Sequence, residues 1–168
     1  MTSLAPINNW GGLHPLIVHF PIALLFVAPL FLLLGIIIEK LLKPFYLCAL
    51  ILMVLGTAGI FFAVSTGNSA AEIIATDPAI TATLAAHVHF AERSQLSFSI
   101  LDILFLIYVL SPNFTQNRIG KPDWVAGALF LIIYLFNITL VFNAAHHGGK
   151  LVHQHGVRST LYQDPPIK

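Results

Sequence analysis

The sequence predicts an all-α fold: an integral membrane four-helix bundle with both chain ends on the same side of the membrane. Of its 168 residues, 57% are hydrophobic and only 9% are charged. That balance excludes an ordinary soluble domain, because lipid must surround most of the surface. Four apolar stretches, at about residues 13–38, 44–66, 84–110 and 123–147, each exceed the roughly 20 residues that cross a bilayer. We therefore expect one transmembrane domain over residues 1–168, of which 148–168 form a polar C-terminal tail.

Charge and helix-capping residues bound the first two spans. The first span contains no charged residue, but Pro21 should kink it, because proline lacks the amide hydrogen that a helix needs. A charged turn from Glu39 to Lys43 leads to the second span. That span should end near Thr66, since Ser69 and Glu72 form a capping box for a further short helix.

The third and fourth spans differ in length. A single helix from Pro78 to Leu110 would be about 50 Å long, against a hydrocarbon thickness of about 30 Å. Its first turns must therefore lie in the membrane interface. The fourth span runs from Asp123 to about His147, and the glycine pair Gly148 and Gly149 should end it.

Positive charges in the short loops predict the orientation. Lys40 and Lys43 lie in one loop, Arg118 and Lys121 lie in another, and residues 67–86 between the second and third spans contain no Lys or Arg. Because positively charged loops tend to remain in the cytoplasm, both chain ends should face outward.

The eight histidines all fall on that outward side. Groups that ionise within a membrane are functional candidates, because hydrocarbon tolerates them only with a partner or in the bundle interior. The alternative is that they stay hydrated at the headgroup level and have an interfacial role only. The set consists of His14, His19, His87, His89, His146, His147, His153 and His155.

Helical geometry limits which histidines can meet. At about 100° per residue His14 and His19 point apart, and so do His87 and His89, so one of each pair can share a seam. We expect His19 and His89, the deeper members, to bridge the first and third spans. Two imidazoles on facing helices are the axial ligands of a noncovalent b-type haem. Covalent attachment through a CxxCH motif is excluded, since Cys48 is the only cysteine.

A porphyrin would also need room and a charged partner. Gly56, Gly59, Ala63 and Gly67 form a stripe of small residues on the second span, which admits either a flat ring or a packed helix. Arg93 is the expected partner of a haem propionate, because a guanidinium donates charge-assisted hydrogen bonds.

Direct coordination of copper or zinc is the alternative use of the histidines, since imidazole suits both metals. The C-terminal histidines His146, His147, His153 and His155 resemble a small surface cluster. Copper handling usually involves methionine or cysteine ligands as well, and the chain has only two methionines.

Asp102 is an acidic residue deep within the third span. It lies about 20 Å beyond His89 along the helix axis, in the other half of the membrane. It is either a proton-relay or quinone-site residue, or a protonated acid that hydrogen-bonds to Asn137 or to a neighbouring subunit.

Two long motifs stand near the ends of the chain, LHPLIVHFPIAL at residues 13–24 and GGKLVHQHGV at residues 148–157. They resemble an uncharacterised bacterial membrane-protein family, the domain of unknown function 2231, over nearly the whole chain. The resemblance implies that His14, His19, one of His87 or His89, and His155 occupy recurring histidine positions. A second site would form with His14 if His155 folded back under the bundle. The resemblance also implies a bacterial inner membrane, periplasmic histidines and the company of cytochrome-containing respiratory systems.

These observations favour a b-type cytochrome subunit that holds one or two haems near the periplasmic face and passes electrons within a larger complex. We expect no stand-alone enzyme, because no nucleophile, phosphate loop or open metal triad is evident. The alternatives are a copper or zinc binding membrane protein and a non-catalytic structural subunit. Expected partners are other membrane subunits, lipid and a quinone; nucleic acid is excluded by the balance of 8 Lys and Arg against 7 Asp and Glu.

Overall fold

The computed structural model describes residues 10–74, 78–115 and 121–158, and every regular element in these ranges is a helix. Four long helices make up the fold: α2 (His19–Ile37), α3 (Leu42–Ile74), α4 (Thr81–Val109) and α6 (Lys121–His153). Short helices adjoin them. These are η1 (Trp10–Leu13) and α1 (His14–Ile17) before α2, η2 (Glu39–Leu41) between α2 and α3, and α5 (Pro112–Thr115) after α4.

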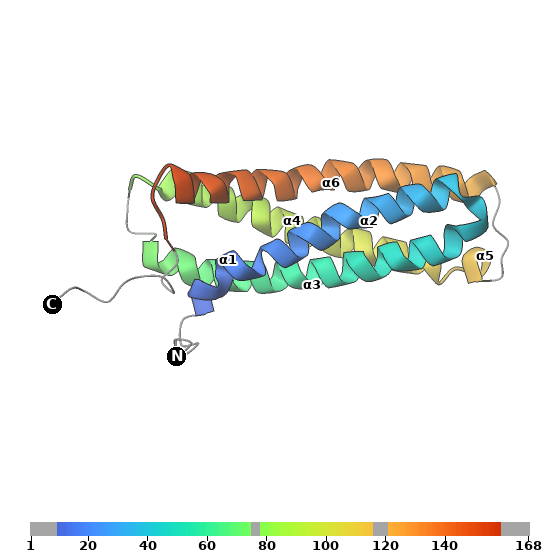
Figure 1. Ribbon diagram of the computed structural model, residues 1–168, viewed down its shortest axis with the longest axis horizontal. Helices are drawn as coiled ribbons and strands as arrows, with labels where there is room; N and C mark the ends of the chain where they lie inside the picture. Colours follow the sequence, from blue (N-terminus) through green and yellow to red (C-terminus); the bar gives the residue numbers. More distant parts are fainter. Residues whose placement is uncertain (1–9, 75–77, 116–120, 159–168) are drawn as a thin grey trace, which may run out of the picture.

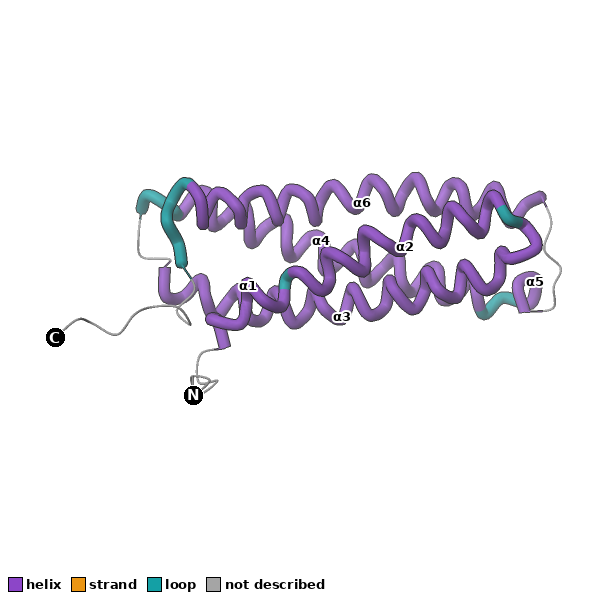
Figure 2. The backbone as a smooth tube through the Cα atoms, in the orientation of Figure 1, coloured by secondary structure: helices purple, strands orange, loops and turns teal. Residues whose placement is uncertain are grey.

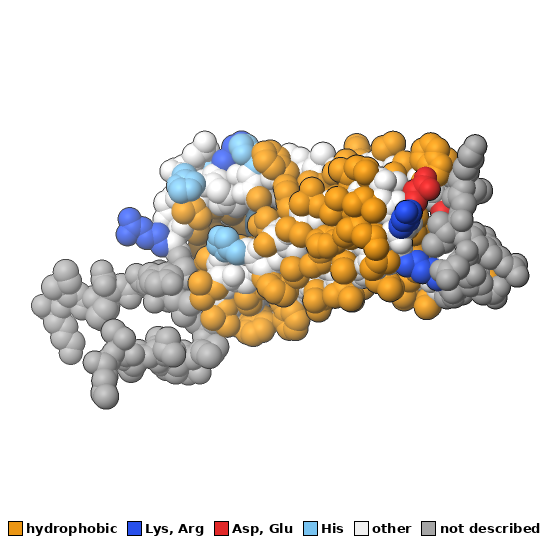
Figure 3. Space-filling model, turned by 45° about the vertical axis from the view of Figure 1, so that its right-hand side comes forward, with side chains coloured by type: hydrophobic (Ala, Val, Ile, Leu, Met, Phe, Trp, Pro, Cys, Tyr) orange, Lys and Arg blue, Asp and Glu red, His pale blue; other side chains and the backbone are white. Residues whose placement is uncertain are grey.

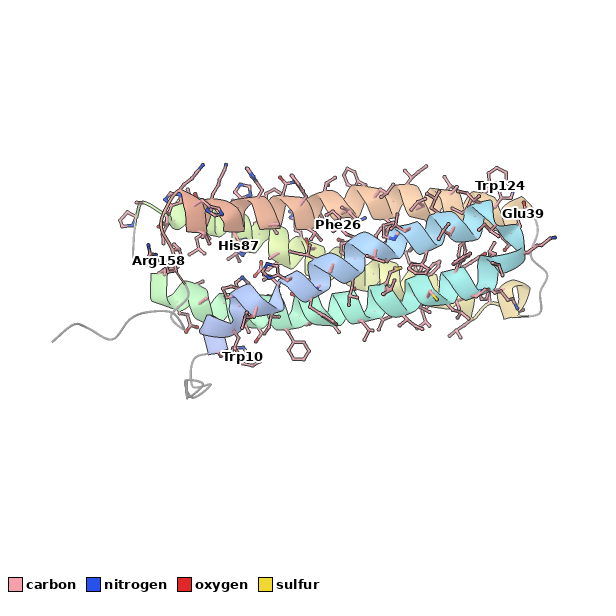
Figure 4. All side chains as sticks on the ribbon, viewed as in Figure 1. Trp10, Phe26, Glu39, His87, Trp124 and Arg158 are labelled. Carbon is pink, nitrogen blue, oxygen red and sulfur yellow. The ribbon has the colours of Figure 1, made fainter. Side chains whose placement is uncertain are left out.

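The four long helices run side by side along the molecule (Figure 1). Helices α2 and α4 each pack against both α3 and α6. A short connection with η2 joins α2 to α3, as the tube in Figure 2 shows. Trp10 and Arg158 lie at one end, and Glu39 and Trp124 lie at the other (Figure 4). The predicted all-α four-helix bundle is therefore confirmed.

The outer surface of the bundle is apolar. Large hydrophobic side chains such as Phe26, Ile51, Ile107 and Phe136 are exposed, and hydrophobic groups cover the middle of the face drawn in Figure 3. Within the described residues, Trp10–Ile37, Glu39–Glu72 and Asp123–His153 are long and apolar enough to cross a membrane. Helix α4 is more polar, because it carries acidic and basic residues within its length.

The core between the helices contains aliphatic and aromatic side chains, and one of the aromatic residues replaces a hydrogen bond that a proline removes. Pro29 lies inside α2 and cannot donate to the carbonyl four residues earlier, that of Leu25. The Tyr134 hydroxyl on α6 donates to this same carbonyl oxygen at 2.9 Å. The ring of Tyr134 is fully buried against Phe98. Helix α2 thus contains a proline whose lost hydrogen bond is replaced from a neighbouring helix.

The hydrogen-bond pattern of the first span is disturbed just before Pro21, although Val18 there keeps helical dihedral angles, and the predicted kink stays a prediction. The helix is interrupted at Val18, which separates α1 from α2, within one turn before Pro21. The amide of Ile22 donates to the Val18 carbonyl across a long 3.4 Å. The interruption allows α1 and η1 to pack on α3 independently of the rest of α2.

The predicted end of the second span as a helix is wrong. Helix α3 continues through Ser69 to Ile74, with no new helix beginning at the predicted capping box. A Cβ at Gly11 would lie 2.7 Å from the Ala70 backbone nitrogen, so η1 lies directly on this part of α3. The Trp10 indole also donates to the Ser65 hydroxyl at 3.1 Å. These contacts from the N-terminal segment favour the longer helix.

The predicted end of the fourth span as a helix is also wrong. Helix α6 continues through Gly148 and Gly149 to His153. The glycine that reverses the chain is Gly156, whose φ of 69° lies in the left-handed region that favours glycine. The amide of Val157 then donates to the Leu151 carbonyl at 3.0 Å, so the residues after α6 fold back toward the bundle.

Candidate functional site

A cavity of about 490 Å³ occupies the end of the bundle where Trp10 and Arg158 lie. All four long helices contribute to its wall, together with η1, α1 and the residues that follow α6. The wall is mostly apolar and includes several small residues. Its titratable side chains are His14, His19, His87, Glu92, His153 and Arg158.

His14 of α1 and His87 of α4 face each other in this cavity. Their ring centroids are 6.0 Å apart, with an angle of 83° between the ring planes. The structure therefore brings together one histidine from each predicted pair, but not His19 with His89. His19 lines the cavity, whereas His89 is exposed, lies outside the cavity wall and contacts the ring of Phe90.

Backbone hydrogen bonds determine the tautomers of the two facing rings. His14 Nδ1 lies 2.9 Å from the Ala63 carbonyl oxygen, and His87 Nδ1 lies 2.8 Å from the Ala144 carbonyl oxygen. A carbonyl only accepts, so each Nδ1 carries the hydrogen and donates it. In the neutral ring the lone pair is then on Nε2. This second-sphere arrangement is typical of metal-ligating histidine.

His14 has a second partner on α3. Its Nδ1 lies 3.2 Å from the Thr66 hydroxyl oxygen. That hydroxyl donates in turn to backbone carbonyls of α3, that of Phe62 at 2.9 Å or that of Ala63 at 3.0 Å. Thr66 is fully buried. The ring of His14 is thus held by two groups of a neighbouring helix.

His19 and His147 form similar bonds within their own helical segments. His19 Nδ1 donates to the Pro15 carbonyl at 2.7 Å, and His147 Nδ1 donates to the Asn143 carbonyl at 2.8 Å. His19 adds a third Nε2 lone pair to the cavity wall. His147 is stacked on Phe90 at 5.5 Å and is not part of the wall.

The predicted C-terminal histidine cluster is dispersed. His146 is exposed beside His147, and His153 lines the cavity. His155 folds back, but its Nε2 lies 3.1 Å from the Thr83 hydroxyl of α4 and not beside His14. In the part of the chain that the structure describes, no three His, Cys, Asp or Glu side chains are close enough to hold one metal ion.

The arginine that lines the cavity is Arg158 and not Arg93, the predicted partner of a haem propionate. Arg93 is exposed on α4 and is not part of the wall. Arg158, in the segment that Gly156 folds back, is part of it. The position of Arg158 is not evident from the sequence, since it depends on the reversal of the chain after α6.

The small-residue stripe of α3 serves two purposes. Cβ atoms at Gly56 and Gly59 would collide with Leu25 and Pro21, so these two glycines allow α2 to pack closely. A Cβ at Gly67 would instead lie 2.9 Å from His14 Cε1. Ala63 and Gly67 therefore line the cavity, whereas Gly56 and Gly59 allow α2 and α3 to pack closely.

Comparison with protein-family models identifies the chain. The model described as "Predicted membrane protein (DUF2231)" matches residues 12–161. The chain belongs to this family. No curated protein and no solved structure matches it.

As a DUF2231 member with three strongly apolar helical segments, the chain is a multi-pass membrane protein in contact with lipid. The family description gives no activity, ligand or partner. The matched region includes the cavity-lining residues from His14 to Arg158, and Gly11 precedes it by one residue.

Asp102 lies away from the cavity of this DUF2231 protein. Its carboxyl group interacts with the Thr57 hydroxyl of α3, and Asp102 Oδ1 and that hydroxyl oxygen are both buried. No hydrogen bond joins Asp102 to Asn137 in the described part of the chain, where the Asn137 amide nitrogen donates to the Ile133 carbonyl of its own helix at 2.8 Å. Asp102 is therefore a half-buried acid in the bundle, separate from the histidine site.

Proposed function

We propose that this protein is a membrane-embedded b-type cytochrome subunit, in which His14 and His87 are the two axial ligands of a haem. The observation that carries the proposal is the facing pair of imidazoles, each with its Nδ1 hydrogen bonded to a backbone carbonyl. Each ring therefore offers a neutral Nε2 lone pair, which is what iron in a bis-histidine haem binds. Haem, when bound, supplies one-electron exchange at its iron.

The distances support one shared metal centre. Imidazole nitrogen binds a metal at about 2.0 Å, so two ligand nitrogens on opposite sides of one ion lie about 4 Å apart. Rings whose centroids are 6.0 Å apart are within reach of that arrangement. Two ligands are sufficient for haem, because the porphyrin fills the remaining positions of the iron.

The cavity supports a flat apolar ligand with acidic groups. Its volume of about 490 Å³ falls within the roughly 300–1,000 Å³ of cofactor pockets. Its wall is mainly apolar, as a porphyrin requires, and Arg158 provides a guanidinium for a propionate. His19 and His153, also in the wall, are available to a second ligand or to hydrogen bonds with the first.

The proposed setting is a bacterial inner membrane, with the histidine end at the periplasmic face. Lys40 and Lys43 lie at or near the opposite end, which the tendency of positive loops to stay inside assigns to the cytoplasm. A subunit that only exchanges electrons needs a donor and an acceptor. We propose neighbouring cytochrome-containing subunits, or a quinone, for these roles.

The test is the absorbance spectrum of protein purified gently from its native membrane, before and after dithionite, with a pyridine haemochrome assay. We expect a sharp reduced α band that is lost in His14→Ala and in His87→Ala. His89→Ala and His146→Ala are the matched controls, because both histidines are exposed and lie outside the cavity wall. A flat spectrum together with stoichiometric copper or zinc would overturn the haem proposal in favour of metal binding.

A further inference from the structure

The ring of His14 contacts two residues of α3, Ala63 and Gly67. It donates from Nδ1 to the carbonyl of Ala63, and Gly67 lies four residues further along the same helix. A Cβ at Gly67 would have three nearest heavy atoms, all of them in the His14 ring: Cε1 at 2.9 Å, Nδ1 at 3.2 Å and Nε2 at 3.6 Å. The imidazole of His14 thus occupies the space that a side chain at position 67 would fill.

His87 has the same arrangement on α6. It donates from Nδ1 to the carbonyl of Ala144, and Gly148 follows four residues later. A Cβ at Gly148 would meet only His87 within 4 Å, with Cε1 at 3.1 Å and Nδ1 at 3.3 Å. In both cases the histidine lies near the start of one helical segment, α1–α2 or α4. The alanine and the glycine lie near the end of the next long helix, α3 or α6.

We infer that the site consists of two equivalent half-sites, and that Gly67 and Gly148 are positioning residues for His14 and His87. Without a side chain at the glycine, each ring approaches the neighbouring helix closely enough for Nδ1 to reach the carbonyl one turn earlier. That bond places the lone pair on Nε2. The inference deepens the proposed function and rests on it for the identity of the ligand.

Helix packing alone does not account for these two glycines. Gly59, on the same stripe as Gly67, would place its Cβ 3.1 Å from Pro21 and therefore serves the contact with α2. The atoms that face Gly67 and Gly148 are imidazole atoms instead. Gly149, adjacent to Gly148, would place a Cβ within 4 Å of no described atom.

The first test compares Gly67→Ala and Gly148→Ala with Gly149→Ala in the purified protein. We expect about 10-fold weaker haem binding in the first two variants, the size of effect that second-sphere changes have on metal sites, and a shift from low-spin to high-spin iron. Gly67→Ala should have the larger effect, because its contact is shorter, at 2.9 Å against 3.1 Å. Gly149 also lines the cavity, so Gly149→Ala controls for an added methyl group as such. Gly59→Ala controls for helix packing.

The second test needs no haem. Nitrogen-15 spectra of histidine-labelled full-length protein in detergent report which ring nitrogen carries the hydrogen. We expect the Nδ1–H form of His14 to be lost in Gly67→Ala only, and that of His87 in Gly148→Ala only, with both retained in Gly149→Ala.

Unchanged tautomers, with haem affinity and spin state also unchanged in both alanine variants, would overturn the inference. If the wild-type protein binds no haem but the tautomers still change as expected, the proposed function fails and the positioning role of the glycines stands. The two hypotheses are therefore distinguished by the same set of variants.

Discussion

At the scale of single residues, this protein uses hydrogen bonds between helices to satisfy groups that its own sequence leaves without partners. Lipid offers no hydrogen bond to a freed carbonyl, so the partner must come from the protein. Pro29 frees the Leu25 carbonyl, and the Tyr134 hydroxyl occupies it. In the histidine site the neighbouring helices provide the acceptors instead. Carbonyls of α3 and α6 accept the ring hydrogens of His14 and His87.

Tyr134→Phe should lower the free energy of unfolding in detergent by about 1–2 kcal/mol, because it leaves the buried Leu25 carbonyl without a donor. The cost should shrink in a Pro29→Ala background, where residue 29 regains an amide hydrogen that can donate to that carbonyl. A double-mutant cycle by chemical denaturation measures the coupling. Equal costs in the two backgrounds would show that the hydroxyl does not replace the helix bond.

At the scale of elements, glycines determine how closely the helices approach. Tyr46 of α3 is fully buried between α2 and α6, with its ring against Gly35 and its hydroxyl against Gly127. The hydroxyl has no hydrogen-bond partner among the described residues. The rings of Phe105, Tyr108 and Phe114 surround it. The end of the bundle opposite the cavity is therefore a closely packed aromatic core.

Gly127→Ala should destabilise the bundle by about 1–3 kcal/mol, because the added methyl group overlaps the Tyr46 hydroxyl. Tyr46→Phe should recover much of this loss, since it removes the overlapping oxygen and leaves no polar group unsatisfied.

Gly35→Ala is the matched comparison for that rescue. Its Cβ would lie 2.5 Å from Cε1 of the Tyr46 ring, which phenylalanine retains. Thermal unfolding of the two single and two double variants should therefore show rescue by Tyr46→Phe at Gly127 and none at Gly35. Equal rescue at both positions would contradict this account of the packing.

At the scale of the whole molecule, the bundle has two different ends separated by an apolar band. Histidine side chains gather toward one end of the face in Figure 3, where Lys or Arg side chains also appear, and both basic and acidic side chains appear at the other end. Of the charges used to predict orientation, Lys40 is described and exposed, whereas Arg118 lies outside the described residues. Because positive loops tend to stay inside, we predict that the end with Lys40 faces the cytoplasm.

Orientation can be measured with single cysteines in a Cys48→Ser background. Gln154→Cys, at the histidine end, should react with a membrane-impermeant maleimide in cells with a permeabilised outer membrane. Lys40→Cys, at the opposite end, should react only after the inner membrane is opened, since positive loops stay inside. The reverse labelling pattern would place the cavity at the cytoplasmic face.

The sequence by itself determined the helical membrane bundle, three of the four predicted apolar spans and the gathering of the histidines at one end. These properties follow from hydropathy and from the distance of each residue along its helix, which are local. Even the disturbance at Pro21 was predictable, because it depends on a bond within the same helix.

Only the tertiary structure decided which histidines face each other and where α3 and α6 end. The facing pair depends on the rotation of each helix about its own axis, and one residue changes that direction by about 100°. Packing between helices sets this rotation, and in this bundle it selects His14 and His87 rather than His19 and His89. The Ala63–Gly67 and Ala144–Gly148 pairs share one spacing that is visible in the sequence. The role of each pair is evident only from its contact with a histidine of another helix. In the sequence alone, a glycine that leaves room for a ring cannot be distinguished from a glycine that ends a helix.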